Sequence, residues 1–151
     1  MDIVFVNNSN SLNGLSIKNY SSNPGIGGTE YVTIKIIYGI QKFSKIFNVS
    51  LATNQKVLSN SINIIPRKRQ IINSIIVLPV HQIKYLNSLK IKNCRIILWS
   101  HHPHDTIPYT KHYFKEVVSL GEYQYISNKN ISTKKFVIPN PYPKPVPQEK
   151  L

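Results

Sequence analysis

Short runs of apolar residues, many of them β-branched, recur along the chain and alternate with segments rich in Asn, Ser, Gly and Pro. Such runs are typical of strands that are buried on both faces of a parallel sheet. They predict strands at residues 3–8, 49–53, 74–80, 94–100, 116–120 and 135–139, with a further strand near 62–66. No internal repeat is evident.

A longer segment after the first strand carries apolar residues at helical spacing. The predicted helix begins at Thr29, a residue type that caps helices, and its apolar side is expected to face the sheet while its lysines face away. The apolar side comprises Ile36, Ile37, Ile40, Phe43 and Phe47, and the opposite side comprises Lys35, Lys42 and Lys45. Shorter helices are expected at 83–90, 109–115 and 122–127.

The order of these elements predicts the fold class. Strands and helices alternate along the chain, which favours an α/β fold with a doubly wound, Rossmann-like parallel sheet. The 151 residues are about enough for one domain. We expect this domain to occupy residues 1–140 and to be followed at 141–151 by a proline-rich linker, which continues neither a helix nor a central strand.

The chain is strongly basic, with a formal net charge of +13 from 19 basic and 6 acidic residues. This charge raises two alternatives, a nucleic-acid partner and peripheral contact with an anionic membrane. The lysines are scattered singly, however, and the one dense cluster, at 67–69, is more typical of a solvated loop. We therefore expect no specific nucleic-acid partner, and membrane contact stays open.

Several features of the sequence predict a cytoplasmic location, free or at the inner face of the membrane. An acid, Asp2, stands where a secretory signal would be basic. The longest apolar run, 71–80, is interrupted and much shorter than the roughly 20 residues that a membrane span needs. Cys94 is the single cysteine, so a buried structural thiol is expected and no internal disulfide.

A Gly-rich loop precedes the predicted long helix and is a candidate anion site. Ligands of open parallel sheets bind at the carboxyl ends of the strands, and N–H groups at a helix start favour an anion. Glu30 replaces the third Gly of the dinucleotide fingerprint, and the chain lacks the Gly-Lys pair of a nucleotide-triphosphate loop. A phosphate site at Gly27, Gly28 and Thr29 and a simple tight turn are equal alternatives at this point.

Three histidines follow a predicted strand, so they are expected at the same edge of the sheet. The spacing of His101, His102 and His104 departs from the H-x-H-x-D-H pattern of metallo-hydrolases. We expect no metal, although a hydrolase that uses His102, His104 and Asp105 is a further alternative. A neutral imidazole at His101 can exchange a hydrogen bond with a ligand hydroxyl or with a loop carbonyl, and His81 is a weaker candidate.

Four segments, in order along the chain, resemble the N-terminal domain of retaining GT-B glycosyltransferases, in particular their large family-four group. The first, "GIGGTEYVTIKII", is similar to a G-G-x-E loop followed by a helix. The second, "WSHH" at 99–102, matches W-x-H-D except that His102 replaces the acid. The others, "VVSLGEYQYIS" and "KKFVIPNPYP", resemble V-x-x-S-E and I-P-N-G segments, with Gly121 and Pro141 as departures.

The resemblance implies hexosyl transfer from a nucleotide-sugar donor to a hydroxyl of a sugar or lipid-linked acceptor, without a cofactor. The implied site comprises His101 as the catalytic residue, with Gly27, Gly28, Thr29, Glu30 and His102 as donor- or acceptor-binding residues. The paired glutamates of the family's donor-binding C-terminal domain have no counterpart here. We therefore expect the chain to be inactive alone and to need a continuing domain or a separate subunit.

Overall fold

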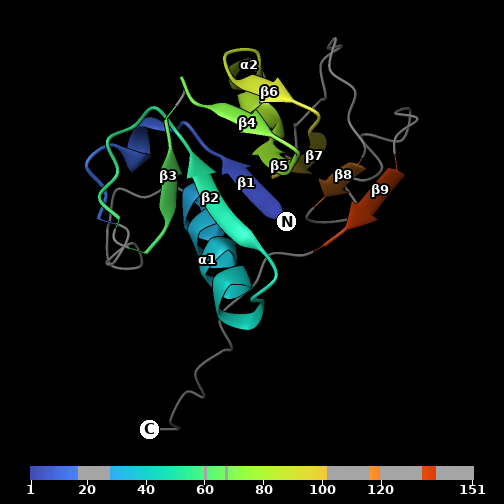
Figure 1. The fold of residues 1–151 in the computed structure, drawn as a ribbon, viewed down its shortest axis with the longest axis horizontal. Coiled ribbons are helices and arrows are strands. Elements are labelled where there is room, and N and C mark those ends of the chain that lie inside the picture. The colour runs from blue at the N-terminus through green and yellow to red at the C-terminus, as the bar shows by residue number, and fades with distance from the viewer. Residues whose placement is uncertain (17–27, 60, 67, 102–115, 120–133, 139–151) are drawn as a thin grey trace, which may run out of the picture.

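The computed structural model describes residues 1–16, 28–59, 61–66, 68–101, 116–119 and 134–138. Seven parallel strands form one sheet in the order β3-β2-β1-β5-β7-β8-β9 (Figure 1). These are β1 (Asp2–Val6), β2 (Asn48–Ala52), β3 (Asn63–Ile65), β5 (Ser74–Pro79), β7 (Arg95–Ser100), β8 (Glu116–Ser119) and β9 (Lys134–Val137). The strands run outward in one direction from β1 to β3 and in the other from β5 to β9, which is compatible with the predicted Rossmann-like fold.

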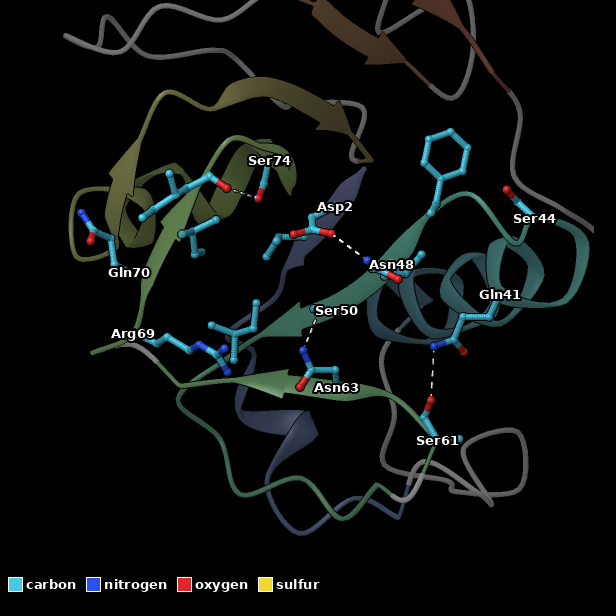
Figure 2. A pocket seen from close by; sticks show the side chains of 16 residues that line it. Asp2, Gln41, Ser44, Asn48, Ser50, Ser61, Asn63, Arg69, Gln70 and Ser74 are labelled. Carbon is cyan, nitrogen blue, oxygen red and sulfur yellow. Dashed lines mark hydrogen bonds between the residues drawn. The ribbon is translucent and has the colours of Figure 1, made fainter.

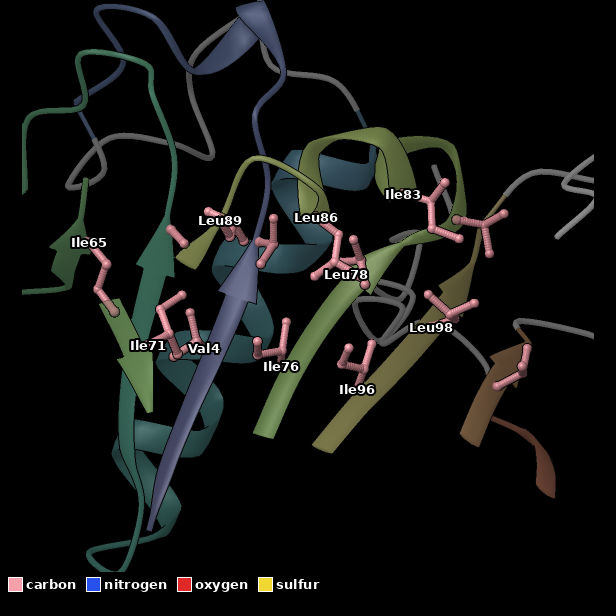
Figure 3. Packing of buried hydrophobic residues seen from close by; sticks show 14 residues of the cluster. Val4, Ile65, Ile71, Ile76, Leu78, Ile83, Leu86, Leu89, Ile96 and Leu98 are labelled. Atoms are coloured by element: carbon pink, nitrogen blue, oxygen red, sulfur yellow. The ribbon is translucent and has the colours of Figure 1, made fainter. Parts of the chain in front are cut away.

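The remaining elements cover the two faces of this sheet. The long helix α1 (Gly28–Phe43) covers one face, and the short elements between the strands cover the other (Figures 1 and 3). The short elements are β4 (Gln70–Ile72), η3 (Val80–Gln82), α2 (Ile83–Leu86) and β6 (Lys90–Lys92). Of these, β4 and β6 pair in parallel as a separate two-stranded sheet. The remaining short element, η1 (Asn10–Leu12), contributes Leu12 to the core on the α1 side.

Alternating strand residues build two separate cores. On the α1 side, Phe5 and Leu51 pack with Ile34 and Ile37 of the helix. On the opposite side, the even-numbered residues of β5 and β7 pack beneath β4 and α2, as Figure 3 shows for Leu78 and Leu98. Because strand side chains point alternately to the two faces, near-continuous apolar runs are what a sheet covered on both sides requires.

The apolar side predicted for α1 is confirmed except at Phe43. Ile37 is buried in the core, and Ile36, Ile40 and Phe47 are partly buried against it, although Phe47 lies beyond the last helical turn. Phe43 is 83% exposed, and Val32 and Ile34 are buried in its place. Thr29 is the second helical residue rather than the cap, and the hydroxyl of Thr33 donates to its carbonyl oxygen at 2.7 Å.

The direction of α1 decides which edge of the sheet its first turn reaches. Just beyond its last turn, the carbonyl oxygen of Ile46 accepts a hydrogen bond from the backbone nitrogen of Met1 at 3.2 Å. Asn48 then donates its N–H to the carbonyl oxygen of Met1 at 3.1 Å as β2 begins. The last turn therefore lies at the amino edge of the sheet, and the first turn, 28–30, lies at the carboxyl edge.

Two consecutive units of the chain have the same structure, although no repeat was predicted. Gln70 of β4 pairs with Lys90 of β6, twenty positions later. The following strands β5 and β7 pair with the same offset, from Ile75 and Arg95 onward. Each unit reverses direction at an asparagine in the left-handed region, Asn73 with φ 50° and Asn93 with φ 54°. The interruption of the apolar run 71–80 at Asn73 is thus the boundary between two strands.

The remaining predictions from the sequence concern the other strands and helices, the linker and Cys94. The predicted strands all have counterparts, whereas the helices expected at 109–115 and 122–127 and the linker at 141–151 lie outside the described residues. Cys94 is half-buried rather than buried, and its thiol donates to the carbonyl oxygen of Lys92 at 3.4 Å. Among the described residues, no helix has the length and apolar character to cross a bilayer.

Candidate functional site

The carboxyl edge of the sheet contains the point where the strand order changes direction. There β1 lies beside β5, but the chain continues from β1 toward β2 on one side and from β5 toward β7 on the other. Loops that leave neighbouring strands in opposite directions open a crevice, which is where ligands of open parallel sheets bind. The residues that follow these two strands are Asn7 and Asn8 after β1 and His81 and Gln82 in η3 after β5.

The side chain of Gln82 joins the two strand ends. Its Oε1 accepts the backbone N–H of Asn8 at 2.6 Å, and its Nε2 donates to Oδ1 of Asn7 at 3.0 Å. Asn7 is completely buried and Gln82 is 9% exposed, so these bonds are shielded from competing water. The amide pair therefore fixes the start of the loop after β1 relative to η3.

A second set of amides extends this network to the end of β2. Oδ1 of Asn8 accepts the N–H of Asn54 at 2.8 Å, and Oδ1 of Asn54 accepts the hydroxyl hydrogen of Tyr85 at 3.1 Å. Nε2 of Gln55 donates to Oδ1 of Asn10 at 3.1 Å. Segments that follow three neighbouring strands are thus held by side-chain amides at one edge.

These side chains border an open hollow of about 400 Å³. Among the described residues that line it, Lys84 alone is permanently charged; the others present amides, a hydroxyl, a phenol and an imidazole. Such groups can both donate and accept hydrogen bonds, as the hydroxyls of a sugar do, whereas a phosphate would demand donors alone. The residues that line the hollow are Asn8, Ser9, Asn10, His81, Gln82, Lys84 and Tyr85.

Buried polar atoms at the same edge have no hydrogen-bond partner within the described part of the chain. They are Nδ2 of Asn7 and the hydroxyls of Ser100 and Ser119, which end β7 and β8. Ser100 and Ser119 are also register partners. Because an unpartnered buried polar group is unfavourable, these atoms are candidates for contact with water or with a ligand.

His101 follows β7 directly and lies on the α1 side of the sheet. Its ring contacts that of Trp99, with centroids 3.8 Å apart and planes tilted by 60°. Trp99 belongs to the core cluster that α1 covers, and the first turn of α1 carries Gly28 and the buried Thr29 and Glu30. The structure therefore brings these three residues and His101 to the same edge and the same side of the sheet.

Some predicted site residues cannot be placed in this arrangement. Gly27 and His102 lie outside the described residues, as do His104 and Asp105 of the metal-hydrolase alternative. Within the described ranges, no group of three or more His, Cys, Asp or Glu residues is close enough together to hold a metal ion. His81, expected to be a weaker candidate, lines the hollow.

A larger hollow of about 680 Å³ lies at the opposite, amino edge. Its lining includes the starts of β1, β2, β3 and β5 at Asp2, Asn48, Asn63 and Ser74 (Figure 2). Figure 2 shows that its polar groups already bond to one another, for example Asn48 to Asp2 at 3.1 Å and Asn63 to Ser50 at 2.9 Å. The smaller hollow is therefore the better ligand site, because its donors and acceptors converge where the sheet changes direction.

The amide network was missed by sequence reasoning. Asn8 and Gln82 match no motif, and Asn is so frequent in this chain that no single one stands out. Their position directly after predicted strands was the only signal that could have identified them.

No family model matches the chain, and no curated protein or solved structure proved similar to it. The assignment of a function therefore depends on the residues of the site.

Proposed function

We propose that the chain is the acceptor-side domain of a GT-B glycosyltransferase, and that the hollow at the carboxyl edge binds a sugar. In this proposal a hexosyl group passes from a nucleotide-sugar to a hydroxyl of a sugar or lipid-linked acceptor. The Rossmann-like sheet supplies the edge at which both substrates meet.

The observation that carries the proposal is the amide-rich hollow beside β1 and β5. Sugars are recognised by side chains that present both donors and acceptors, and the amides of Asn8, Asn10 and Gln82 offer both at the hollow. The bonds among Asn7, Asn8 and Gln82 hold these groups in place before a ligand arrives, which reduces the entropy lost on binding.

The first turn of α1 and His101 have separate roles in this proposal. The N–H groups at Gly28 and Thr29, together with the dipole of a 16-residue helix, favour the diphosphate of the donor. His101 exchanges a hydrogen bond with the acceptor hydroxyl or with the transferred sugar. Glu30 is positioned within the same turn to accept a bond from a sugar hydroxyl.

Binding can be tested by following backbone amide resonances during titration with methyl α-glucoside, methyl α-mannoside, UDP-glucose and GDP-mannose. We expect at least one glycoside to shift the resonances of Asn8, Gln82 and Tyr85, and nucleotide-sugars to shift Thr29 and Glu30 as well. Inorganic phosphate alone should leave the hollow unperturbed, because Lys84 is the single permanent cation among the described residues that line it.

A matched pair of variants sharpens this test. Asn10→Ala removes an amide that lines the hollow, and Asn63→Ala removes one that lines the larger hollow at the amino edge. We expect the first to weaken glycoside binding about fivefold or more, since one hydrogen bond contributes roughly 1 kcal/mol, and the second to leave it unchanged. Equal effects of both variants, or shifts confined to the amino edge, would refute the proposal.

A further inference from the structure

The amino edge of the sheet carries half of the exposed large apolar side chains of the described residues, including the three most exposed. Phe43 is 83% exposed, Ile46 77%, Met1 63% and Ile72 45%. They are four of the eight large apolar side chains that are exposed among the described residues, and three of the other four lie in or next to the edge strand β9. A gathering of this kind on one surface indicates an interaction site.

Hydrogen bonds show that these residues belong to one continuous rim. The backbone nitrogen of Met1 donates to the carbonyl oxygen of Ile46 at 3.2 Å, which joins β1 to the segment after α1. On the other side, Asp2 pairs in register with the start of β5. The turn before β5, at Asn73, donates its N–H to the carbonyl oxygen of Lys92 at 3.1 Å. The rim therefore extends from the end of α1 to the end of β6.

Cations alternate with the apolar side chains along this rim. Lys42, Lys45 and Lys92 are all exposed. The ammonium group of Lys42 lies 5.3 Å from the centroid of the Phe43 ring, so the most exposed aromatic side chain is directly accompanied by a positive charge. These ammonium groups can therefore contact an anionic surface while the neighbouring apolar side chains contact the same surface.

The acids of the same rim are already engaged. Oδ1 of Asp2 accepts a hydrogen bond from Nδ2 of Asn48 at 3.1 Å. Glu116, at the start of β8, accepts two hydrogen bonds from the guanidinium of Arg95. These bonds and the charge of Glu116 raise the pKa of Arg95 above its ordinary value. A neutral amide does not balance the carboxylate of Asp2, but Lys42, Lys45 and Lys92 outnumber it and Arg95 balances Glu116. The described part of the rim is therefore positive, in keeping with the net charge of the chain.

From this combination we propose that the amino edge docks on the surface of an anionic membrane. Phe43 and Ile46 enter the interface between headgroups and acyl chains, and Lys42, Lys45 and Lys92 contact the lipid headgroups. A nucleic acid would be attracted by the same cations but would leave Phe43 and Ile46 in water, so a lipid surface fits both observations better. The proposal is independent of the sugar site, which lies at the opposite edge.

Co-sedimentation with vesicles tests the apolar part of the proposal. We expect the full chain to bind vesicles that mix phosphatidylcholine with phosphatidylglycerol and to bind pure phosphatidylcholine much more weakly. The double variant Phe43→Ser/Ile46→Ser should lose roughly tenfold or more in partitioning, from the apolar surface that no longer enters the bilayer. The control Leu58→Ser, at a position 57% exposed but remote from the rim, should bind like the original chain.

Two double lysine variants test the contribution of charge to membrane binding. Lys42→Gln/Lys45→Gln should reduce binding by roughly fivefold per lysine, and Lys56→Gln/Lys84→Gln, which removes equal charge from exposed positions elsewhere, should reduce it far less. Equal losses in both double variants would overturn the proposed surface, because net charge alone would then explain binding.

Fluorescence distinguishes insertion from adsorption and from nucleic-acid binding. Trp99 is only 5% exposed, so it gives a constant background against which Phe43→Trp reports the rim. We expect a blue shift of Phe43→Trp on anionic vesicles and no shift for Leu58→Trp. Absence of the blue shift would overturn the proposal, as would duplex DNA binding as tight as vesicle binding together with no effect of Phe43→Ser/Ile46→Ser on vesicles.

Discussion

At its carboxyl edge the sheet ends in side-chain amides that bond to one another around a hollow, whereas at its amino edge it ends in tight turns, lysines and exposed apolar side chains. The same strands contribute to both edges, so strand composition does not account for the difference. The lengths of the connections between the strands and helices account for it. A single residue separates β4 from β5 at the amino edge, but the connection from β1 to α1 at the carboxyl edge extends from Asn7 to Gly27.

This contrast suggests a division of roles within a parallel sheet. Long connections can place donors and acceptors around a ligand, while short ones leave strand starts and helix ends near the surface. Of the two hollows described, the larger lies at the amino edge, so volume alone would have favoured the edge opposite to the proposed sugar site. The following three changes test the contrast, in order of decreasing effect.

Gln82→Leu is expected to have the largest effect. It removes the partners of the part-buried N–H of Asn8 and of the buried Oδ1 of Asn7, and an unsatisfied buried group costs about 1–3 kcal/mol. We expect the free energy of unfolding in urea to fall by about 2–4 kcal/mol. The matched change at the amino edge, Gln41→Leu, breaks one exposed bond to the carbonyl oxygen of Ser61 and should cost less than about 1 kcal/mol. Similar losses of stability in both variants would show that the amide network at the carboxyl edge contributes no more to stability than the exposed bond of Gln41.

Asn73→Ala should have an intermediate effect. The left-handed conformation of this residue is unfavourable for alanine, and its Oδ1 accepts a hydrogen bond from Nδ2 of Asn93 at 2.7 Å. We expect a loss of about 1–2 kcal/mol in urea unfolding. Asn73→Gly relieves the backbone strain and should recover part of that loss; if it is as damaging as Asn73→Ala, the conformation at Asn73 is not what the turn requires.

Ser100→Ala should have the smallest effect on stability and the opposite sign. The buried hydroxyl of Ser100 has no hydrogen-bond partner among the described residues, so its removal should leave thermal stability unchanged or slightly raised. Glycoside binding should weaken if the hydroxyl serves a ligand. Ser44→Ala, which removes another such hydroxyl near the end of α1, should change neither stability nor binding.

The sequence allowed the main strands to be predicted because runs such as residues 75–80 are apolar throughout, as burial on both faces demands. The three-residue strands β4 and β6 were missed because they are too short to show a period and join the next strand through a single Asn. The exposure of Phe43 was missed for another reason. Its spacing fits the helical pattern, but the sheet does not extend beneath the last turn of α1.

The candidate site was predictable only in part. Its location at the carboxyl edge and the placement of Thr29, Glu30 and His101 there follow from the alternation of strands and helices. The bonds made by Gln82 do not, since they join Asn7 and Asn8 across more than seventy positions of sequence and depend on the register of β1 with β5. Side-chain amides carry no spacing signature, so only tertiary structure reveals such a cluster.

The twin reversals at Asn73 and Asn93 have a consequence for the width of the molecule. Each unit carries one strand for the main sheet and one for the small sheet above it, and both pairings keep the same interval of twenty positions. A tandem copy of one unit would therefore widen both layers together by one strand, and in the main sheet a single ladder, such as that of β7 with β8, would have to form again on the new strand. Both sheets can therefore gain strands on this side by duplication of a single unit.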